Sequence, residues 1–400
     1  MKEARNPSSA RWYRIQQGSN RPLELAVSVI EKTDREHPAD AVLRSALKET
    51  KGITREESRQ VAELVFNWFR WCGWFTGPER LEERVHQAEA LAKDYSLGRM
   101  KIAFDELKAK AIPPWVMDHM EVPERWLVML QRKPVLWIRA RAKDREQLER
   151  TLLDLTPSSL PMCTDALEYP GEVDLFRLEA FQKGCFELQD LSSQAVSHWC
   201  DPKPGETWWD ACAGEGGKTL HLSDLMQNKG LIWASDRAEW RLKRLKQRTA
   251  RAGVFNYRPA VWDGGSKLPT KTKFDGVLID APCTGMGTWQ RNPHARWSVT
   301  PNDIKELAVV QLNLLKHASK GVKPGGKLVY SVCTLSRAET TEVANAFQEA
   351  CPEFEPLPLK SVRGASNEIA HQMWLWPQEV RANGMFVAAW RLRKSQATAS

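Results

Sequence analysis

No apolar run in the sequence approaches the roughly 20 residues that a membrane-spanning helix needs. The first 22 residues, MKEARNPSSARWYRIQQGSNRP, also lack the apolar segment of a secretory signal peptide. Both absences argue against a membrane or secreted protein. We therefore expect a cytoplasmic protein with no membrane partner, and nothing in the sequence demands more than a monomer.

Cysteine is sparse and scattered. Eight cysteines are spread over 400 residues, and no two of them form a C-x-x-C pair. This pattern argues against a disulfide framework and against a structural zinc site, so we predict no bound metal. The thiols are then free for chemistry in a reducing compartment.

The charge is unbalanced toward positive residues, with a formal net charge of +8. The segment RAEWRLKRLKQRTAR, residues 237–251, holds seven Lys or Arg against one Glu, and residues 1–22 hold five against one. A basic protein favours a polyanionic partner such as a nucleic acid, although either run alone fits a solvated helix face equally well.

Three regions follow one another along the chain. Residues 1–130 show helical periodicity, and Thr54 and Glu57 form the capping box of one helix. Residues 131–185 predict a small α+β unit. Residues 186–395 alternate strands with helices, which predicts an α/β domain with a mostly parallel sheet covered by helices.

The segment TWWDACAGEGGKTLHL predicts a strand, a glycine-rich turn and the start of a helix. Its spacing matches neither a phosphate-binding P-loop nor the strict dinucleotide pattern, but such a turn also suits S-adenosylmethionine. Acids at the ends of later strands complete a ligand crevice. The predicted cofactor-binding residues are Ala213, Gly214, Glu215, Gly216, Gly217, Lys218, Asp236, Arg241, Asp263 and Asp280. Of these, Asp236 is expected to take the ribose hydroxyls and Asp263 the adenine amine.

Two cysteines lie just beyond apolar runs, in DAPCTGMGTWQRNPHARW and in KLVYSVCTLSRAE. Because strand ends meet at one edge of a parallel sheet, Cys283 and Cys333 indicate one site with two thiols. The residues alone do not say which thiol attacks a substrate.

Five segments, FELQDLSSQAV, DACAGEGGKT, DAPCTGMG with RNP, KPGGKLVYSVCTL and NGMFVAAWRL, resemble in order the motifs of the RsmB/Nop2/Sun RNA cytosine-5 methyltransferases. The resemblance is dense over residues 180–395. It implies a Rossmann-like class I methyltransferase domain, an RRM-like unit over residues 131–185 and a NusB-like RNA-binding bundle at the N-terminus.

The resemblance also implies roles for single residues. Cys333 is the nucleophile that adds to carbon 6 of cytosine, and Cys283 assists product release. Asp280 hydrogen-bonds the amino edge of the cytosine and helps to protonate the ring, and Lys218 lies near the cofactor or the substrate. Such chemistry needs a thiol because carbon 5 is too weak a nucleophile to take a methyl group unaided.

We expect a flipped base in single-stranded or looped RNA, contacted by Arg291 and Asn292. Arg291 and Asn292 can alternatively shape their own loop. Ribosomal RNA is the first substrate expected and transfer RNA the alternative.

Other classes remain for comparison. A non-catalytic RNA-binding assembly factor would not need both thiols, and a DNA cytosine methyltransferase would lack the second one. The chain departs from the residues common in the family at Glu215, His294, Val332 and Thr340, and none of these departures removes a catalytic group.

Overall fold

The computed structural model describes residues 20–152, 154–361 and 370–394. By their internal contacts the described residues form two compact units. The first holds the residues up to Pro114 together with Leu130–Arg132 and Asn292–Val299, and the second holds Trp115–Met129, Lys133–Arg291 and the residues from Thr300. The basic run before residue 20 lies outside the described residues. Among those described, no helix has the length and apolarity to cross a membrane.

The first unit is helical. Its principal elements are α2 (Arg21–Glu31), α3 (Ala39–Glu49), α4 (Arg55–Trp71), the short 3-10 helix η1 (Cys72–Trp74), α5 (Leu81–Ser96) and α6 (Phe104–Lys110). The predicted capping box is confirmed: the Glu57 N–H donates to Thr54 Oγ1 at 3.1 Å, and the Thr54 N–H donates to Glu57 Oε2 at 2.7 Å. Apolar stripes of α2, α3 and α4, including Val29, Leu43 and Val65, pack into one core.

A short segment from much later in the chain completes this unit. It contains α14 (Ala295–Ser298). Arg296 is fully buried, and its guanidinium donates to the carbonyl oxygens of Ala111 at 2.7 Å and Leu130 at 3.0 Å. The Trp297 indole N–H donates to the Phe69 carbonyl at 2.7 Å. These buried bonds make Asn292–Val299 part of the helical unit's packing.

The second unit begins with two short helices, α7 (Val116–His119) and α8 (Glu124–Leu130), and a small antiparallel sheet of order β2–β3–β1–β4. The strands are β1 (Trp137–Ala140), β2 (Thr156–Pro157), β3 (Ala166–Glu168) and β4 (Phe186–Leu188), with helices α9 (Arg145–Thr151), η2 (Leu175–Arg177) and α10 (Glu179–Gln182). Ile138, Leu148 and Phe186 lie in its core. A small α+β arrangement was predicted for residues 131–185, and the sheet extends it to Leu188.

The main sheet has the order β10–β12–β9–β8–β5–β6–β7, and β11 pairs with β12. Its strands are β5 (Thr207–Asp210), β6 (Leu231–Asp236), β7 (Tyr257–Val261), β8 (Phe274–Asp280), β9 (Val322–Val332), β10 (Phe354–Pro356), β11 (Gln372–Leu375) and β12 (Met385–Leu392). The strands from β5 to β9 pair in parallel, and β12 is antiparallel to β9. The predicted, mostly parallel sheet is confirmed.

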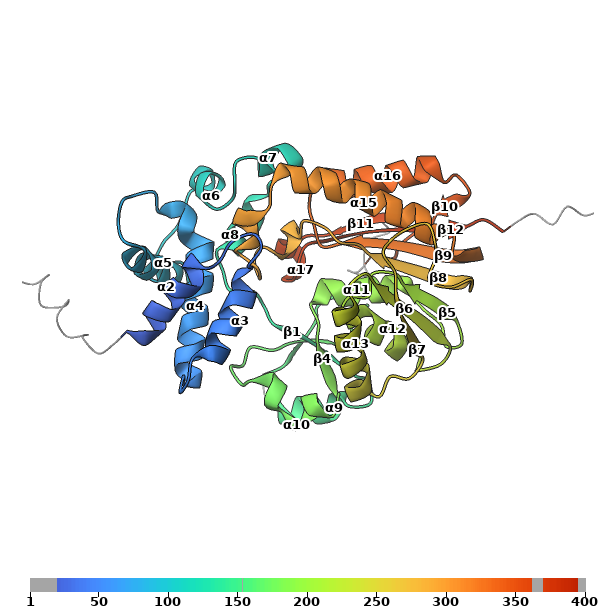
Figure 1. The fold of residues 1–400 in the computed structure, drawn as a ribbon, viewed down its shortest axis with the longest axis horizontal. Helices are drawn as coiled ribbons and strands as arrows, with labels where there is room; N and C mark the ends of the chain where they lie inside the picture. The colour runs from blue at the N-terminus through green and yellow to red at the C-terminus, as the bar shows by residue number, and fades with distance from the viewer. Residues whose placement is uncertain (1–19, 153, 362–369, 395–400) are drawn as a thin grey trace, which may run out of the picture. The chain divides into compact units, whose positions relative to one another are not determined.

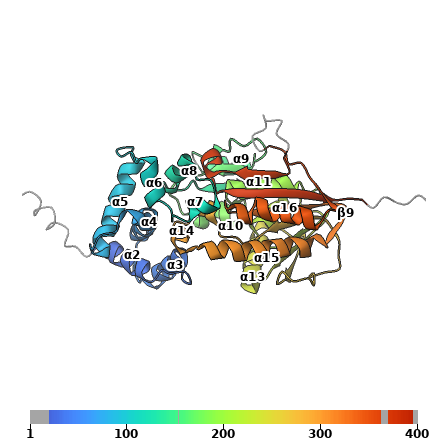
Figure 2. The ribbon, with the colours of Figure 1, turned by 90° about the horizontal axis from the view of Figure 1, so that it is seen from above.

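Helices cover both faces of this sheet (Figure 1). One face carries α11 (Leu191–Cys200), α12 (Gly217–Leu225) and α13 (Glu239–Ala252), and the other carries α15 (Pro301–Ser319) and α16 (Thr341–Ala350), which run side by side (Figure 2). Shorter pieces are η3 (Met286–Thr288), η4 (Arg337–Glu339) and α17 (Pro377–Val380). The consecutive β5 residues Trp208 and Trp209 belong to different hydrophobic cores, because successive side chains of a strand point to opposite faces of the sheet.

Candidate active site

A cavity of about 520 Å³ opens at the carboxyl ends of the parallel strands of the second unit. This is the edge where a doubly wound sheet binds ligands. Most of the predicted site residues line it, namely Ala213, Gly214, Glu215, Gly217, Lys218, Asp236, Arg241, Asp263, Asp280, Cys283 and Cys333. The structure therefore brings the glycine turn, the strand-end acids and both thiols together.

The glycine turn joins β5 to α12. Gly214 and Gly216 have φ values of 55° and 89°, in the left-handed region that glycine adopts at low cost. A Cβ atom on Gly216 would lie 2.8 Å from Leu245 Cγ. Gly216 does not line the cavity, so its role is to let the turn pack closely against α13.

Two of the predicted cofactor acids also hold the backbone around them. Asp236 is buried, and its carboxylate accepts the N–H groups of Gly214 at 3.0 Å and Ala238 at 2.8 Å. Asp263 accepts the Gly265 N–H at 2.8 Å. The acid that ends β6 therefore fixes the glycine turn on the neighbouring strand.

Glu215, one of the departures from the family pattern, has a local partner. Its carboxylate lies 2.7 Å from the Arg244 guanidinium, and Arg248 donates to its carbonyl oxygen at 3.2 Å. Both arginines belong to α13. Glu215 thus ties the glycine turn to the basic helix, and its charge is neutralised there.

The two thiols are adjacent. Cys283 follows β8 and Cys333 follows β9, and their Sγ atoms are 3.4 Å apart. The Gly287 N–H donates to the Cys333 carbonyl at 3.0 Å, which joins the two loops. The hydrogen bond to Cys333 and burial together raise the pKa of the Cys283 thiol well above its ordinary value. Cys283 therefore holds its proton more tightly than an ordinary cysteine, and its S–H can donate a hydrogen bond to the Cys333 sulfur.

An ion pair between buried Lys218 and half-buried Asp280 lines the same cavity as the thiols. The Lys218 ammonium donates to Asp280 Oδ2 at 2.7 Å, and the Ser331 hydroxyl donates to Asp280 Oδ1 at 2.8 Å. Burial alone would lower the pKa of Lys218, but the negative charge of Asp280 outweighs it, so the pKa is raised. Lys218 therefore remains charged, and its charge also acts on Cys333.

Sequence reasoning missed Asp210, the last residue of β5. It is fully buried and lines the cavity, where Thr219 donates to its Oδ2 at 2.6 Å and no described residue bonds Oδ1. Burial raises its pKa to about 7. The signal was present as the final acid of TWWD, but a strand-end Asp gives no indication of how deeply it will be buried.

A third thiol, Cys212, also lines the cavity. Burial and the nearby acids Asp210, Asp280 and Asp236 raise its pKa above the ordinary value. Since a thiolate is the reactive form, this thiol is poorly suited to attack a substrate. Trp262 and Leu314 supply apolar walls to the same cavity.

Glu339 was also missed. Its fully buried carboxylate accepts five hydrogen bonds, from the Thr284 N–H (2.9 Å), the hydroxyls of Thr284 (2.5 Å), Thr334 (3.1 Å) and Ser336 (2.8 Å), and the Gln311 amide (3.1 Å). Thr284 and Thr334 directly follow Cys283 and Cys333. Glu339 therefore holds the two cysteine loops together from behind.

The residues predicted to contact RNA do not line the cavity. Arg291 lies 3.3 Å from the buried carboxylate of Asp190, and the side chain of Arg291 is 42% exposed. Asn292 belongs to the helical unit, where its Oδ1 is buried without a hydrogen-bond partner among the described residues. His294, another departure, packs edge-on against Phe69. RNA contact by Arg291 and Asn292 stays a prediction.

The parallel sheet with a glycine turn, strand-end acids and a ligand cavity at its carboxyl edge defines a Rossmann-like methyltransferase domain. The family model described as 16S rRNA methyltransferase RsmB/F matches residues 197–391. The chain is 33% identical over 324 residues to the probable ribosomal RNA small subunit methyltransferase B of Synechocystis sp., a match that covers 76% of this chain and 71% of that protein. The chain therefore belongs to the RsmB/F family of rRNA methyltransferases, which confirms the resemblance predicted from the motifs.

Two further comparisons fit this assignment. The probable ribosomal RNA small subunit methyltransferase B of Bacillus subtilis is 40% identical over 178 residues, which cover 44% of this chain and 40% of that protein. The crystal structure of PH0851 superposes with a TM-score of 0.75 and 25% identity, over 92% of this chain and 98% of that one. The RRM-like and NusB-like assignments of the first two regions stay predictions.

Proposed function

We propose that this protein transfers a methyl group from S-adenosylmethionine to carbon 5 of a cytosine in RNA, with ribosomal RNA as the substrate. The observation that carries the proposal is the pair of thiols 3.4 Å apart in the cavity that the glycine turn and the strand-end acids also line. A methyltransferase acting on an already nucleophilic nitrogen or oxygen would need neither thiol.

The cavity residues fit the cofactor. S-adenosylmethionine carries an electrophilic methyl group on a sulfonium and has a cationic amine and two ribose hydroxyls to bind. The unpartnered buried Oδ1 of Asp210 suits a hydrogen-bond donor of that ligand, since a buried acceptor without a partner is costly. Asp236 would accept from the ribose hydroxyls, and Trp262 and Leu314 would flank the adenine.

The environment of the two thiols supports different roles for Cys333 and Cys283. The pKa of the Cys283 thiol is raised, so Cys283 is the poorer nucleophile of the pair and the better hydrogen-bond donor, and the attack is assigned to Cys333, which lies beside the charged Lys218. The Cys333 sulfur adds to carbon 6 of cytosine, so a C–S bond forms as the C5–C6 double bond opens. The electron density this leaves at carbon 5 makes that carbon nucleophilic toward the methyl group, which S-adenosylmethionine gives up as S-adenosylhomocysteine departs. Asp280 is within the cavity to hydrogen-bond the cytosine amino edge.

Release requires the reverse process. After methyl transfer a base takes the proton from carbon 5, the C5–C6 double bond re-forms and the Cys333 sulfur leaves. A Cys283 S–H that donates to the departing sulfur stabilises it as a thiolate and speeds its elimination. Cys283 is therefore the residue proposed to assist product release.

Ribosomal RNA is favoured over transfer RNA because the two relatives described above are named ribosomal RNA small subunit methyltransferases. The thiol pair weighs against a non-catalytic assembly factor, because such a factor has no need of two adjacent thiols in a cofactor cavity.

The test is an assay of the purified chain with S-adenosylmethionine and total RNA from cells that lack the gene, followed by bisulfite sequencing. We expect one protected cytosine in small-subunit rRNA. Cys333→Ala should abolish protection while cofactor binding persists. A protected tRNA position would move the substrate to transfer RNA, and turnover by Cys333→Ala would refute the assigned nucleophile.

Cys283→Ala supplies an independent check in the same assay. Without its S–H the elimination stalls, so a covalent protein–RNA adduct should accumulate and migrate slowly on a denaturing gel. The matched control is the double variant Cys283→Ala/Cys333→Ala, which should form none. An adduct in the double variant would mean that another group attacks the base.

A further inference from the structure

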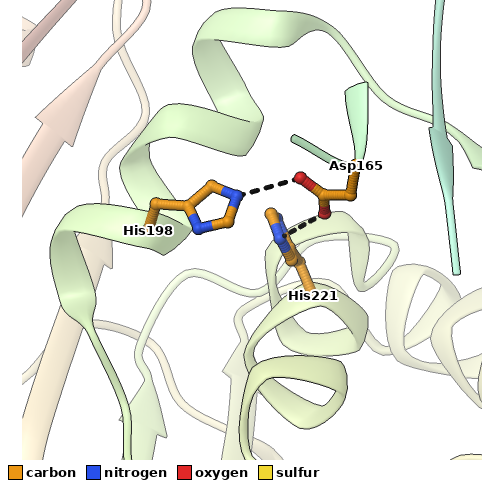
Figure 3. A group of neighbouring side chains, drawn as sticks. All are labelled: Asp165, His198 and His221. Atoms are coloured by element: carbon orange, nitrogen blue, oxygen red, sulfur yellow. Dashed lines mark hydrogen bonds and ion pairs between the residues drawn. The ribbon is translucent and has the colours of Figure 1, made fainter. Parts of the chain in front are cut away.

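Three side chains from distant parts of the chain converge outside the methyltransferase cavity, in the second unit. They are Asp165, just before β3 in the small sheet, His198 on α11 and His221 on α12. Figure 3 shows both imidazole rings turned toward the carboxylate of Asp165. One ligand atom from each of the three lies within 4.8 Å of the other two.

Two of the three distances are close to those between ligands of one metal ion. His198 Nε2 lies 3.0 Å from Asp165 Oδ1, and His221 Nε2 lies 3.0 Å from Asp165 Oδ2 (Figure 3). Ligands about 2.0–2.2 Å from a tetrahedral zinc ion are separated by a little more than 3 Å. Two imidazoles and one carboxylate also form a set that borderline divalent metals prefer.

Hydrogen bonds do not satisfy all the polar atoms of this cluster, as His221 shows. Its side chain is fully buried, and neither ring nitrogen makes a hydrogen bond to any described residue. The 3.0 Å approach to Asp165 has the distance of an ion pair but not the alignment of an N–H···O bond. A buried ring nitrogen without a partner is costly, and a metal ion between the three groups would bind Nε2, the nitrogen that faces Asp165.

One positive charge lies close to the cluster. The Arg139 guanidinium helps to lower the pKa of His221, which shows that its field reaches the ring. Arg139 is itself paired with Asp224, at 2.5 Å. Asp224 also pairs with Arg141, so it offsets only part of the positive charge that a bound cation would meet.

We propose that Asp165, His198 and His221 bind one divalent transition-metal ion of the zinc class. With three protein ligands the fourth position is open to water, and the partial exposure of Asp165 and His198, 19% and 16%, leaves a path for the ion to enter. The site would join the small sheet to α11 and α12. Because His221 follows Lys218 by three residues on α12, a metal there would also hold the helix that begins at the methyltransferase cavity.

The test uses the full-length chain without an affinity tag, stripped with a chelator and then given Zn²⁺ alone. We expect one zinc per chain by elemental analysis and a higher unfolding temperature with zinc than without it. His198→Gln and Asp165→Asn should each weaken zinc binding by at least about tenfold, since even the outer partners of metal ligands contribute that much. Both side chains are partly exposed, so these variants should fold even if a His221 variant does not.

Two controls separate this site from other zinc-binding groups. His37→Gln removes an exposed histidine that pairs with Asp34 in the same way, and it should leave the stoichiometry unchanged. Cys283→Ser/Cys333→Ser removes the adjacent thiols and should still bind one zinc. Loss of zinc in the thiol variant, or equal binding by His198→Gln and the unmodified chain, would overturn the proposal.

Discussion

Among the acids that line the cavity, Asp210 has a pKa that folding shifts into a pH range where its effect on stability can be measured. Burial raises its pKa from 3.8 to about 7, so the folded chain holds this proton more tightly than the unfolded chain. A raised pKa contributes stability that is fully present below about pH 4 and is lost as pH rises toward about 7. The cofactor-free protein should therefore lose stability over this window through Asp210.

The variant Asp210→Asn isolates this effect. Relative to it, the unmodified chain should lose a few kcal/mol of unfolding free energy between about pH 5 and about pH 8, at about 1.4 kcal/mol per pKa unit. Urea unfolding at the two pH values measures the difference.

The control for Asp210 is Asp275→Asn. Burial of Asp275 is outweighed by its bonds to Lys323 and to the Thr207 N–H, so its pKa is lowered and any change lies below this window. Parallel pH curves for the unmodified chain and Asp210→Asn would show that Asp210 ionises normally.

At the scale of elements, one carboxylate joins the loops after β8 and β9 to α15. Glu339 accepts bonds from both loops and from Gln311 of α15, and the Tyr330 hydroxyl of β9 donates to the Glu339 backbone carbonyl at 2.6 Å. A fully satisfied buried network of this kind specifies one arrangement of the elements around it. Here that arrangement sets the separation of the two thiols.

Glu339→Gln should disturb this arrangement. In glutamine one carboxylate oxygen is replaced by an NH₂ group, which cannot accept the hydrogen bonds that this oxygen accepted. Each buried group left without a partner costs roughly 1–3 kcal/mol. We expect a lower unfolding temperature and at least about tenfold slower methyl transfer, while S-adenosylmethionine binding changes little because Glu339 does not line the cavity. Calorimetry and single-turnover kinetics measure the three quantities.

Glu342→Gln, an exposed acid on the adjacent helix α16, is the matched control and should behave like the unmodified chain. A Glu339→Gln variant that transfers methyl groups at the normal rate would show that the thiols are positioned without the network.

At the scale of the whole molecule, the net charge of +8 favours an RNA partner. Four of the basic residues, Lys2, Arg5, Arg11 and Arg14, precede the described part of the chain. Changing all four to Gln should weaken RNA binding and reduce the slope of log affinity against log salt, by as much as about 0.7 for each lost phosphate contact. Affinity measured over a range of salt concentrations tests this.

The matched control removes the same charge at the edge of the main sheet that lies opposite the cavity. Exposed lysines precede the amino ends of the parallel strands, away from the cavity, at Lys203, Lys229, Lys271 and Lys273. Their replacement by Gln should leave the slope nearly unchanged. Equal slopes for the two quadruple variants would mean that the N-terminal residues do not contact phosphate.

The sequence alone was enough to predict the features that depend on short local patterns of residues. The alternation of strands and helices, the glycine turn, the capping box of Thr54 and Glu57 and the order of the motifs are all properties of short segments. They led to the parallel sheet and to the family, both of which are confirmed. The placement of both thiols at one strand edge follows from the same logic, because parallel strands end together.

Tertiary structure alone decided what depends on residues far apart in the chain. No single segment of the sequence indicates the burial that raises the pKa of Asp210 or the five hydrogen bonds to Glu339. The same is true of the packing of Asn292–Val299 in the helical unit and of the cluster formed by Asp165, His198 and His221. Burial and long-range contacts are set by the packing of whole elements, so a linear pattern can say which groups are present but not which of them will share one low-dielectric site.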